Sequence, residues 1–375
     1  ITARTERGVI VGRPAMVSAD PEEIIPGADL ILMALPAFTH RDILSSILPF
    51  LDAGMVIGSL PARGGFDWEC QQVLNNLWEK VPIFGFDTLP WACRIERFGS
   101  AVNILGTKRE VDVAVWPPDQ VGELAGTLAD LLDLKVNPIH NFLSLTLGNP
   151  GQIIHPGIMF GIFHQWDGSL YQEAPLFYQN VDAQTADLLS EISAEIQDIC
   201  QVLQAQLPDL DLTSVIPLHE WLRRAYANDV GDAGSLQSCF RTNRAYRGLR
   251  APMRPVPGGL APDFQARYLV EDVPYGLLVT RGIAEIAGVE TPMIDEVIGW
   301  SQRCMGKEYL RGTPQLLDSS FQNDDSVIER EHSDRSNLNS LSLGAGKLCG
   351  RDLGETRAPQ RYGINHIQQL IGGKF

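Results

Sequence analysis

One histidine and one aspartate are the side chains of this sequence best suited to proton transfer. His155 lies in Gly148-Asn-Pro-Gly-Gln-Ile-Ile-His-Pro-Gly157, between an apolar pair and a Pro-Gly step. Asp272 ends the stretch Arg267-Tyr-Leu-Val-Glu-Asp272. An imidazole changes charge near neutral pH, and an adjacent carboxylate fixes its tautomer. We therefore expect the two to act as a pair. The alternative is a core histidine and an acidic helix cap.

Other chemistries lack their signatures. His219-Glu220 is not followed by the second histidine of a zinc-binding helix, and no Cys-x-x-Cys spacing occurs. His155 and His164 are nine residues apart and share little of a helix face. Neither a Gly-x-Ser-x-Gly elbow nor a Walker loop is present. We expect no metal.

Short apolar runs that alternate with helical patterns predict an α/β domain over residues 1–142. Three runs read as parallel strands, and 101–105 and 111–116 as later strands that close the domain. The three runs cover 29–35, 55–60 and 81–86. Helices are expected over 41–51 and 68–78. Ligands of such sheets bind beyond the carboxyl ends of the strands, here 35–38, 60–65 and 87–93.

The pattern changes near residue 142, and residues 143–375 predict a helical domain. Apolar residues recur at helical spacing over 182–207, and 215–228, 274–287 and 292–306 also read as helices. Residues 314–346 are rich in Ser, Asn and Asp, so we expect a disordered insertion there.

Composition excludes several classes of protein. The 375 residues are 44% hydrophobic and 20% charged, which is typical of a globular chain. A net charge of −16 disfavours nucleic acid as a partner. The longest apolar run, 30–38, is far shorter than the ~20 residues of a membrane helix, so no membrane is expected. Six scattered cysteines predict a reducing compartment, which we take to be the cytoplasm.

Several strings, taken together and in order, resemble the opine dehydrogenases of the octopine and tauropine type. Individually each string is weak, but the resemblance runs nearly end to end. The strings include Leu35-Pro-Ala-Phe38, Asp87-Thr-Leu-Pro-Trp-Ala-Cys-Arg-Ile95, Ile154-His-Pro-Gly157, Glu173-Ala-Pro-Leu-Phe-Tyr-Gln179, Gly259-Leu-Ala-Pro-Asp-Phe264, Arg267-Tyr-Leu-Val-Glu-Asp272, Gly306-Lys-Glu-Tyr-Leu310 and Pro359-Gln-Arg-Tyr-Gly363.

The resemblance implies a Rossmann-like domain followed by an all-α domain of the 6-phosphogluconate-dehydrogenase-like type. It implies a cytoplasmic, monomeric enzyme that uses NADH to condense the α-amino group of an amino acid, or taurine, with pyruvate or a similar 2-oxo acid. The reaction oxidises NADH and so regenerates NAD as the terminal step of anaerobic glycolysis.

The resemblance also assigns roles to single residues. The catalytic pair of the family aligns with His155 and Asp272. Substrate-binding positions fall on Arg63, Thr88, Cys93, Asn149 and Trp221. Cofactor-binding positions fall on Pro36, Ala37, Phe38 and Arg267.

Two departures from the family matter. The octopine type carries Gln at the position of Arg63, so we expect this arginine to bind a carboxylate or sulfonate and to disfavour arginine as a substrate. The glycine-rich turn that begins a Rossmann domain does not occur ahead of these strings in residues 1–375. The sequence opens at Ile1 on a strand-like stretch. We therefore expect the domain to be incomplete at its start, and NADH to bind poorly to residues 1–375.

Two alternatives stay open. Other two-domain dehydrogenases of the glycerol-phosphate type rely on a lysine near the position of His155, but no lysine lies between Lys135 and Lys307. A truncated family member could act only as a binding protein, although retention of both His155 and Asp272 disfavours that reading. The choice of amino acid is left open by the sequence.

Overall fold

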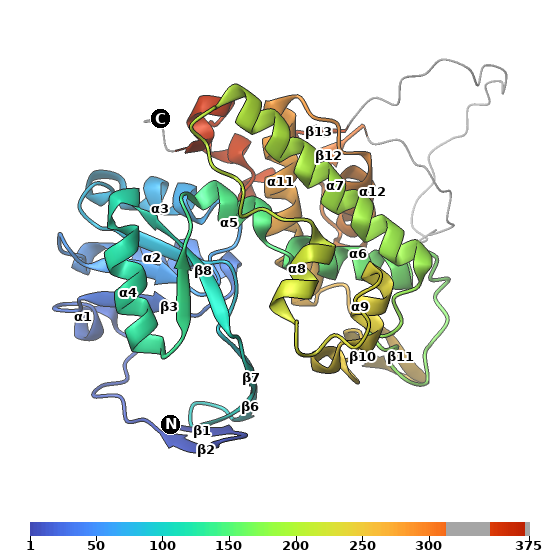
Figure 1. Ribbon diagram of the computed structural model, residues 1–375, viewed down its shortest axis with the longest axis horizontal. Helices are drawn as coiled ribbons and strands as arrows, with labels where there is room; N and C mark the ends of the chain where they lie inside the picture. The colour runs from blue at the N-terminus through green and yellow to red at the C-terminus, as the bar shows by residue number, and fades with distance from the viewer. Residues whose placement is uncertain (313–345, 372–375) are drawn as a thin grey trace.

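The structure, a computed structural model, describes residues 1–312 and 346–371. A sheet-containing part, coloured blue to green in Figure 1, lies beside a helical part. The first part is built on a five-stranded sheet. In spatial order its strands are β3 (Leu30–Met33), β4 (Val56–Ser59), β5 (Ile83–Phe86), β8 (Glu110–Trp116) and β9 (Lys135–Pro138).

The three apolar runs form β3, β4 and β5, which are parallel as expected. The run 111–116, expected as a later strand, forms β8, which is antiparallel to β5 and pairs Trp116 with Ile83. No helix crosses between these two strands, and a parallel pair requires such a crossover. Strand β9, which follows α4 (Val121–Leu132), was not predicted and is parallel to β8.

Residues 101–105 do form a strand, but not in the main sheet. They belong to β7 (Ala101–Thr107), which lies in a second sheet. The order of that sheet is β2 (Gly8–Val11), β1 (Thr2–Thr5), β7 and β6 (Trp91–Arg97). In Figure 1 it extends below the main sheet, towards the N-terminus. Its side chains Ile10, Ile95 and Leu105 are exposed, so it adds little to the core.

Helices α2 (His40–Ile47) and α3 (Phe66–Leu74) connect the parallel strands, and α1 (Pro21–Ile24) precedes β3. The predicted helices 41–51 and 68–78 end earlier than expected, each in a short 3-10 turn. Pro49 lies in the first of these turns, and Asn75 adopts a positive φ of 46° at the second. Proline lacks a backbone N–H, and a left-handed residue reverses the helical path.

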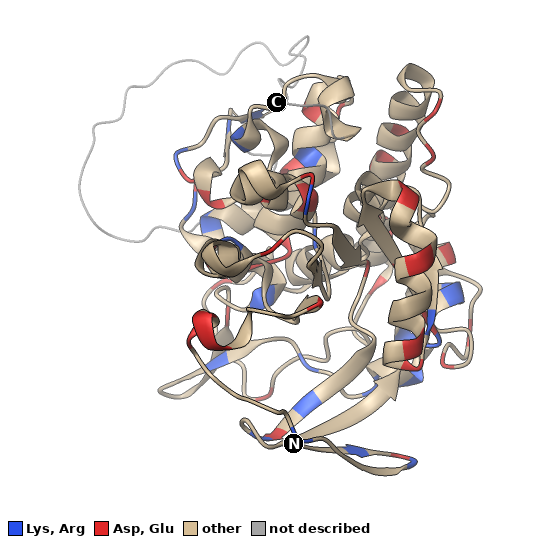
Figure 2. Ribbon diagram, turned by 90° about the vertical axis from the view of Figure 1, so that its left-hand side faces the viewer, with Lys and Arg blue, Asp and Glu red and all other residues tan. Residues whose placement is uncertain are grey.

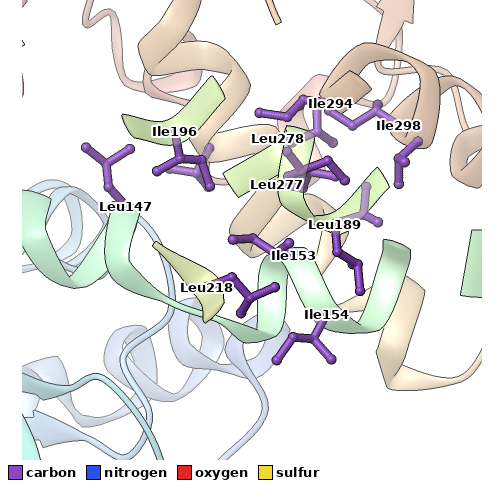
Figure 3. Packing of buried hydrophobic residues seen from close by; sticks show 14 of the residues in the cluster. Leu147, Ile153, Ile154, Leu189, Ile196, Leu218, Leu277, Leu278, Ile294 and Ile298 are labelled. Atoms are coloured by element: carbon purple, nitrogen blue, oxygen red, sulfur yellow. The ribbon is translucent and has the colours of Figure 1, made fainter. Parts of the chain in front are cut away.

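The second part is helical, as predicted, and its core is one large apolar cluster. Its helices are α5 (Phe142–Gly148), α6 (Gly151–Phe163), α7 (Ala183–Gln206), α8 (Leu218–Ala225), α9 (Leu236–Thr242), α10 (Arg267–Val270), α11 (Leu278–Ala287) and α12 (Pro292–Met305). The predicted stripe over 182–207 is the buried face of α7. Figure 3 shows Leu189 and Ile196 of α7 in one apolar cluster with Ile153 and Ile154 of α6.

Two short ribbons accompany the helices and were not predicted. One pairs β10 (Met253–Val256) with β11 (Gly259–Pro262), and the other pairs β12 (Leu310–Arg311) with β13 (Lys347–Leu348). Positive φ angles at Gly258 and Gly259 allow the tight connection between β10 and β11. The predicted insertion at 314–346 lies, apart from Gly346, outside the described residues.

Two glycines bring α6 against α7. A Cβ atom at Gly157 would lie 2.4 Å from Leu189, and one at Gly161 would lie 2.3 Å from the hydroxyl of Thr185. Both distances are shorter than real Cβ contacts, so only glycine permits this approach. The close packing fixes the position of α6, the helix that carries His155.

A fully buried arginine joins the C-terminal segment to the strand-end turns of the first part. Arg357 donates to the carbonyl oxygens of Ala62 at 3.1 Å and Ala37 at 3.2 Å, and to Nδ1 of His40 at 2.9 Å. Tyr362 donates to Glu69 at 3.0 Å. These contacts hold the turns after β3 and β4 against the helical part.

Acidic side chains are spread over several helices rather than gathered on one face (Figure 2). No helix within residues 1–312 and 346–371 has both the length and the apolar character needed to cross a membrane. In the same residues, no group of three or more His, Cys, Asp or Glu side chains is placed to hold a metal ion.

Candidate active site

The structure brings His155 and Asp272 into contact. Nδ1 of His155, in the second turn of α6, lies 2.8 Å from Oδ2 of Asp272, although 117 residues separate them. Asp272 directly precedes a five-residue π-helical turn, η6 (Val273–Leu277), and its side chain is 2% exposed. Such turns often occur at functional sites. Gly276 in η6 allows the approach to α6, because a Cβ there would lie 2.7 Å from Gln152.

Two tyrosines enclose the imidazole. The ring of Tyr268 stacks on that of His155, with centroids 4.2 Å apart and planes 9° apart. The hydroxyl of Tyr178 lies 3.2 Å from Nε2 of His155. Burial raises the pKa of Tyr178 well above its usual value, so the hydroxyl keeps its proton. Asp272 takes the Nδ1 side of the ring, so Nε2 is the nitrogen that faces Tyr178.

Arg63 reaches the same aspartate from the other part of the molecule. Its Nη1 lies 2.8 Å from Oδ1 of Asp272 and donates to Oδ1 of Asn149 at 3.3 Å. Its Nε lies 3.7 Å from Oε1 of Glu271. Arg63 adopts a left-handed φ of 61° in the turn after β4. Two buried atoms here, Nε of Arg63 and Oδ1 of Asp272, have no hydrogen-bond partner among the described residues.

Glu271 links three elements of the site. Its carboxylate accepts from the backbone N–H of Ala37 at 3.0 Å and from Nε of Arg267 at 2.5 Å. The Glu271 side chain is 1% exposed, whereas that of Arg267 is half exposed. Glu271 therefore ties the turn after β3 to the helix that carries Arg267.

The end of β3 offers apolar surface. This strand is at the edge of the main sheet, and Leu32, Leu35 and Phe38 are each about 40% exposed or more. Apolar side chains can hold the rings of a dinucleotide, and the half-exposed guanidinium of Arg267 can bind its phosphates. The exposed apolar edge and this cation fit a nicotinamide cofactor at the turn Pro36–Phe38.

The turn after β5 carries Thr88, whose hydroxyl accepts from Nζ of Lys108. Lys108 also donates to the carbonyl of Leu89 at 3.0 Å. Burial, reinforced by the charge of Arg63, lowers the pKa of Lys108 to about 8. Burial and the nearby Asp112 raise the pKa of Asp87 to about 7.

The other predicted substrate residues are more scattered. Asn149 is buried, and its Oδ1 accepts from the N–H of Gly151 at 2.9 Å, so it shapes the turn before α6. Cys93 is exposed on β6. Trp221 lies on α8, with its ring 5.9 Å from Tyr226. The rings of Tyr226, Tyr246 and Tyr178 continue from there towards His155.

Known proteins resemble the chain over nearly its whole length. A family model described as "NAD/NADP octopine/nopaline dehydrogenase, alpha-helical domain" matches residues 138–305. Octopine dehydrogenase of Pecten maximus is 35% identical, over 97% of this chain and 84% of the relative. Tauropine dehydrogenase of Arabella iricolor is 36% identical, over 96% and 83%. The chain belongs to the opine dehydrogenase family.

Solved structures of the opine dehydrogenase family share this fold. Octopine dehydrogenase with NADH and L-arginine superposes with a TM-score of 0.82 at 33% identity, covering 100% of this chain and 86% of that one. Octopine dehydrogenase with NADH and pyruvate gives a TM-score of 0.80. The matches confirm the expected Rossmann-like domain followed by a helical domain.

Within this opine dehydrogenase fold, four residues of the site were missed by sequence reasoning. Tyr178 and Tyr268 lie inside strings that carry the family resemblance, so their positions were a usable signal. Glu271 was read only as a possible helix cap. Lys108 gave no signal, because it is a single lysine between two strands.

Proposed function

We propose that this protein is an oxidoreductase that forms a secondary amine from an amino acid, or taurine, and pyruvate, with NADH as reductant. The bond that is made and reduced joins the α-nitrogen of the amine to the keto carbon of pyruvate, so the enzyme acts on a CH–NH group. The observation that carries this proposal is the contact between His155 and Asp272 beside the turns after β3 and β4.

His155 exchanges a proton with the substrate through Nε2. The Asp272 carboxylate accepts from Nδ1–H and stabilises the imidazolium. The Nε2–H of that imidazolium donates its proton to the keto oxygen while the amine adds. The neutral Nε2 then takes a proton from the added amine nitrogen and gives it to the hydroxyl oxygen, which leaves as water. General acid–base help of this kind is worth about 10²–10⁴-fold. The neutral Tyr178 hydroxyl beside Nε2 orients the ring and can donate to the same oxygen.

NADH, when bound, supplies hydride to the carbon of the imine. Pro36, Ala37 and Phe38 would hold its nicotinamide end, and Arg267 its phosphates. Glu271 keeps these groups together, because it binds both the Ala37 amide and the Arg267 guanidinium.

The substrates lie between the two parts, against Arg63, Thr88, Cys93, Asn149 and Trp221. The buried Nε of Arg63, which has no hydrogen-bond partner among the described residues, supports a ligand near Arg63. The six cysteines are free thiols, which supports a cytoplasmic location. A monomer suffices for this site, because both parts come from one chain.

An NADH-oxidation assay tests the function. The purified full-length protein is given pyruvate together with glycine, alanine, taurine, β-alanine or arginine. We expect oxidation that requires both pyruvate and one of the amines. Oxidation by pyruvate alone would indicate a simple 2-oxo acid reductase, and no oxidation with any pair would refute the proposal.

A further inference from the structure

We propose that the ammonium group of Lys108 binds the acid group, carboxylate or sulfonate, of a substrate in the active site. This assignment rests on the function proposed above and adds a specificity residue to it. Both pyruvate and the amine substrate carry such an acid group. The kinetic experiment below distinguishes which of the two substrates Lys108 binds.

Lys108 is held against the substrate-binding turn at three points. It lies between β7 and β8, and its backbone N–H donates to the carbonyl of Pro90 at 2.9 Å. Its Nζ donates to the hydroxyl of Thr88 and to the carbonyl of Leu89. An ammonium group has three N–H donors, so one donor is left for a ligand.

The charge of Lys108 lacks a carboxylate in contact. Lys135, on the same domain, is paired with Glu110 at 2.6 Å. No ion pair within residues 1–312 and 346–371 includes Lys108. The carboxyl group that faces it belongs to Asp87, which accepts from the amide of Asp112. The pKa of Asp87 is raised to about 7, mainly by burial, so it is only partly ionised near neutrality.

The surroundings of Lys108 make its charged form less stable than that of a lysine in water. Burial and the charge of Arg63 disfavour the ammonium form and lower the pKa of Lys108, although the charge of Asp87 partly offsets them. A bound anion would reverse this cost, because opposite charges attract strongly where water is scarce. A cation with a free N–H donor and no carboxylate in contact, beside a substrate-binding turn, is therefore suited to bind an anion.

Arg63 is less suited to be the principal anion site. Its guanidinium already lies beside two carboxylates, those of Asp272 and Glu271. An incoming anion there would be repelled by both. Lys108 has no such neighbour in contact, although the protein as a whole carries a net charge of −16.

Steady-state kinetics of Lys108→Met and Lys108→Arg test the assignment, with Lys135→Met as the matched control. Lys108→Met should raise the KM of either pyruvate or the amine by about 10- to 100-fold, the loss expected for one hydrogen bond to a charged group. Lys108→Arg should recover part of that loss, and Lys135→Met should resemble the wild type. The substrate whose KM rises is the one that Lys108 binds.

A pair of amines that differ only in the carboxylate, arginine and agmatine, sharpens the amine arm. If Lys108 binds the amine substrate, Lys108→Met raises the KM for arginine and leaves the KM for agmatine unchanged. KM values for pyruvate and for the amine that both stay within about twofold of wild type would overturn the assignment. Lys108→Gln serves if thermal melting shows that Lys108→Met does not fold. If the wild-type protein shows no activity with any substrate pair, the function proposed above is refuted, rather than the assignment of Lys108.

Discussion

Arg63 is paired with the aspartate that holds the active-site histidine. Its Nη1 lies 2.8 Å from Oδ1 of Asp272, whose other oxygen lies 2.8 Å from Nδ1 of His155. The three side chains come from the turn after β4, the residue before η6, and α6. A cation on the first part of the molecule therefore completes a proton-transfer pair on the second.

This pairing gives Arg63→Gln a distinct outcome. Loss of the cation loosens Asp272, so we expect kcat to fall about 10-fold with all substrates. The sequence-based hypothesis of a carboxylate-binding Arg63 predicts instead a higher KM for one acid substrate and better tolerance of arginine. Measurement of kcat and KM for each substrate separates the two. Arg41→Gln, which removes the ion pair between Arg41 on α2 and Glu69 on α3, is the control. Unchanged kinetics would place Arg63 outside both roles.

His155→Ala should nearly abolish condensation and leave NADH binding largely intact, because the imidazole serves the keto acid. Asp272→Asn should cost less, but at least ~10-fold in kcat/KM, through loss of tautomer control. Single-substrate kinetics and a fluorescence titration with NADH measure these effects. His164→Ala changes a histidine at the end of the same helix and should have little effect. Near-wild-type kcat/KM in both site variants would remove the proposed pair.

Gly151→Ala should impair activity without much loss of stability. A Cβ at residue 151 would lie 2.7 Å from Nη1 of Arg63 and 3.2 Å from Oδ1 of Asp272. The flexible guanidinium can move away, so the free energy of unfolding should change by less than about 1 kcal/mol. The displaced guanidinium leaves Asp272, and kcat should fall as in Arg63→Gln. Gly148→Ala is the control, since its Cβ would lie 3.9 Å from Val215. Equal activity of the two variants would contradict this view.

Acid should weaken the joint between the two parts through His40. Burial and the charge of Arg357 lower the pKa of His40 to about 3, from 6.5. The unfolded chain therefore binds a proton between pH 6.5 and 3 that the folded protein does not. Stability contributed by neutral His40 is present above pH 6.5 and is lost as the pH falls towards 3, by about 2 kcal/mol at pH 5.

Thermal melting between pH 7 and pH 4.5 tests this effect. The His40→Gln variant, which cannot take up a proton, should lose less stability than the wild type over this range. His219→Gln changes a partly exposed histidine and should retain the wild-type slope. Identical slopes in all three proteins would show that His40 protonates without cost.

Local sequence patterns predicted much of the secondary structure. The apolar runs at 29–35, 55–60 and 81–86 became β3, β4 and β5, because buried parallel strands need continuous apolar sequence. The stripe over 182–207 became α7 for an equally local reason, the 3.6-residue period. The direction of β8 and the separate sheet of β7 were missed, since strand pairing joins segments that carry no mark of their partners.

For the candidate site, too, the sequence predicted the residues but not the contacts between them. The sequence and its family resemblance identified His155, Asp272 and Arg63 as functional candidates. Whether they touch depended on how α6, η6 and the turn after β4 pack, and that packing rests on contacts between residues more than 80 positions apart. The boundary near residue 142 stays a prediction.

The sequence by itself therefore determined which residue types were available and which local elements would carry them. Only the tertiary structure decided which charged groups surround each of these residues. It placed Arg63 between two carboxylates and left Lys108 without one in contact among the described residues. The physical reason is that electrostatic interactions depend on distance and burial in three dimensions, which the order of residues along the chain does not state.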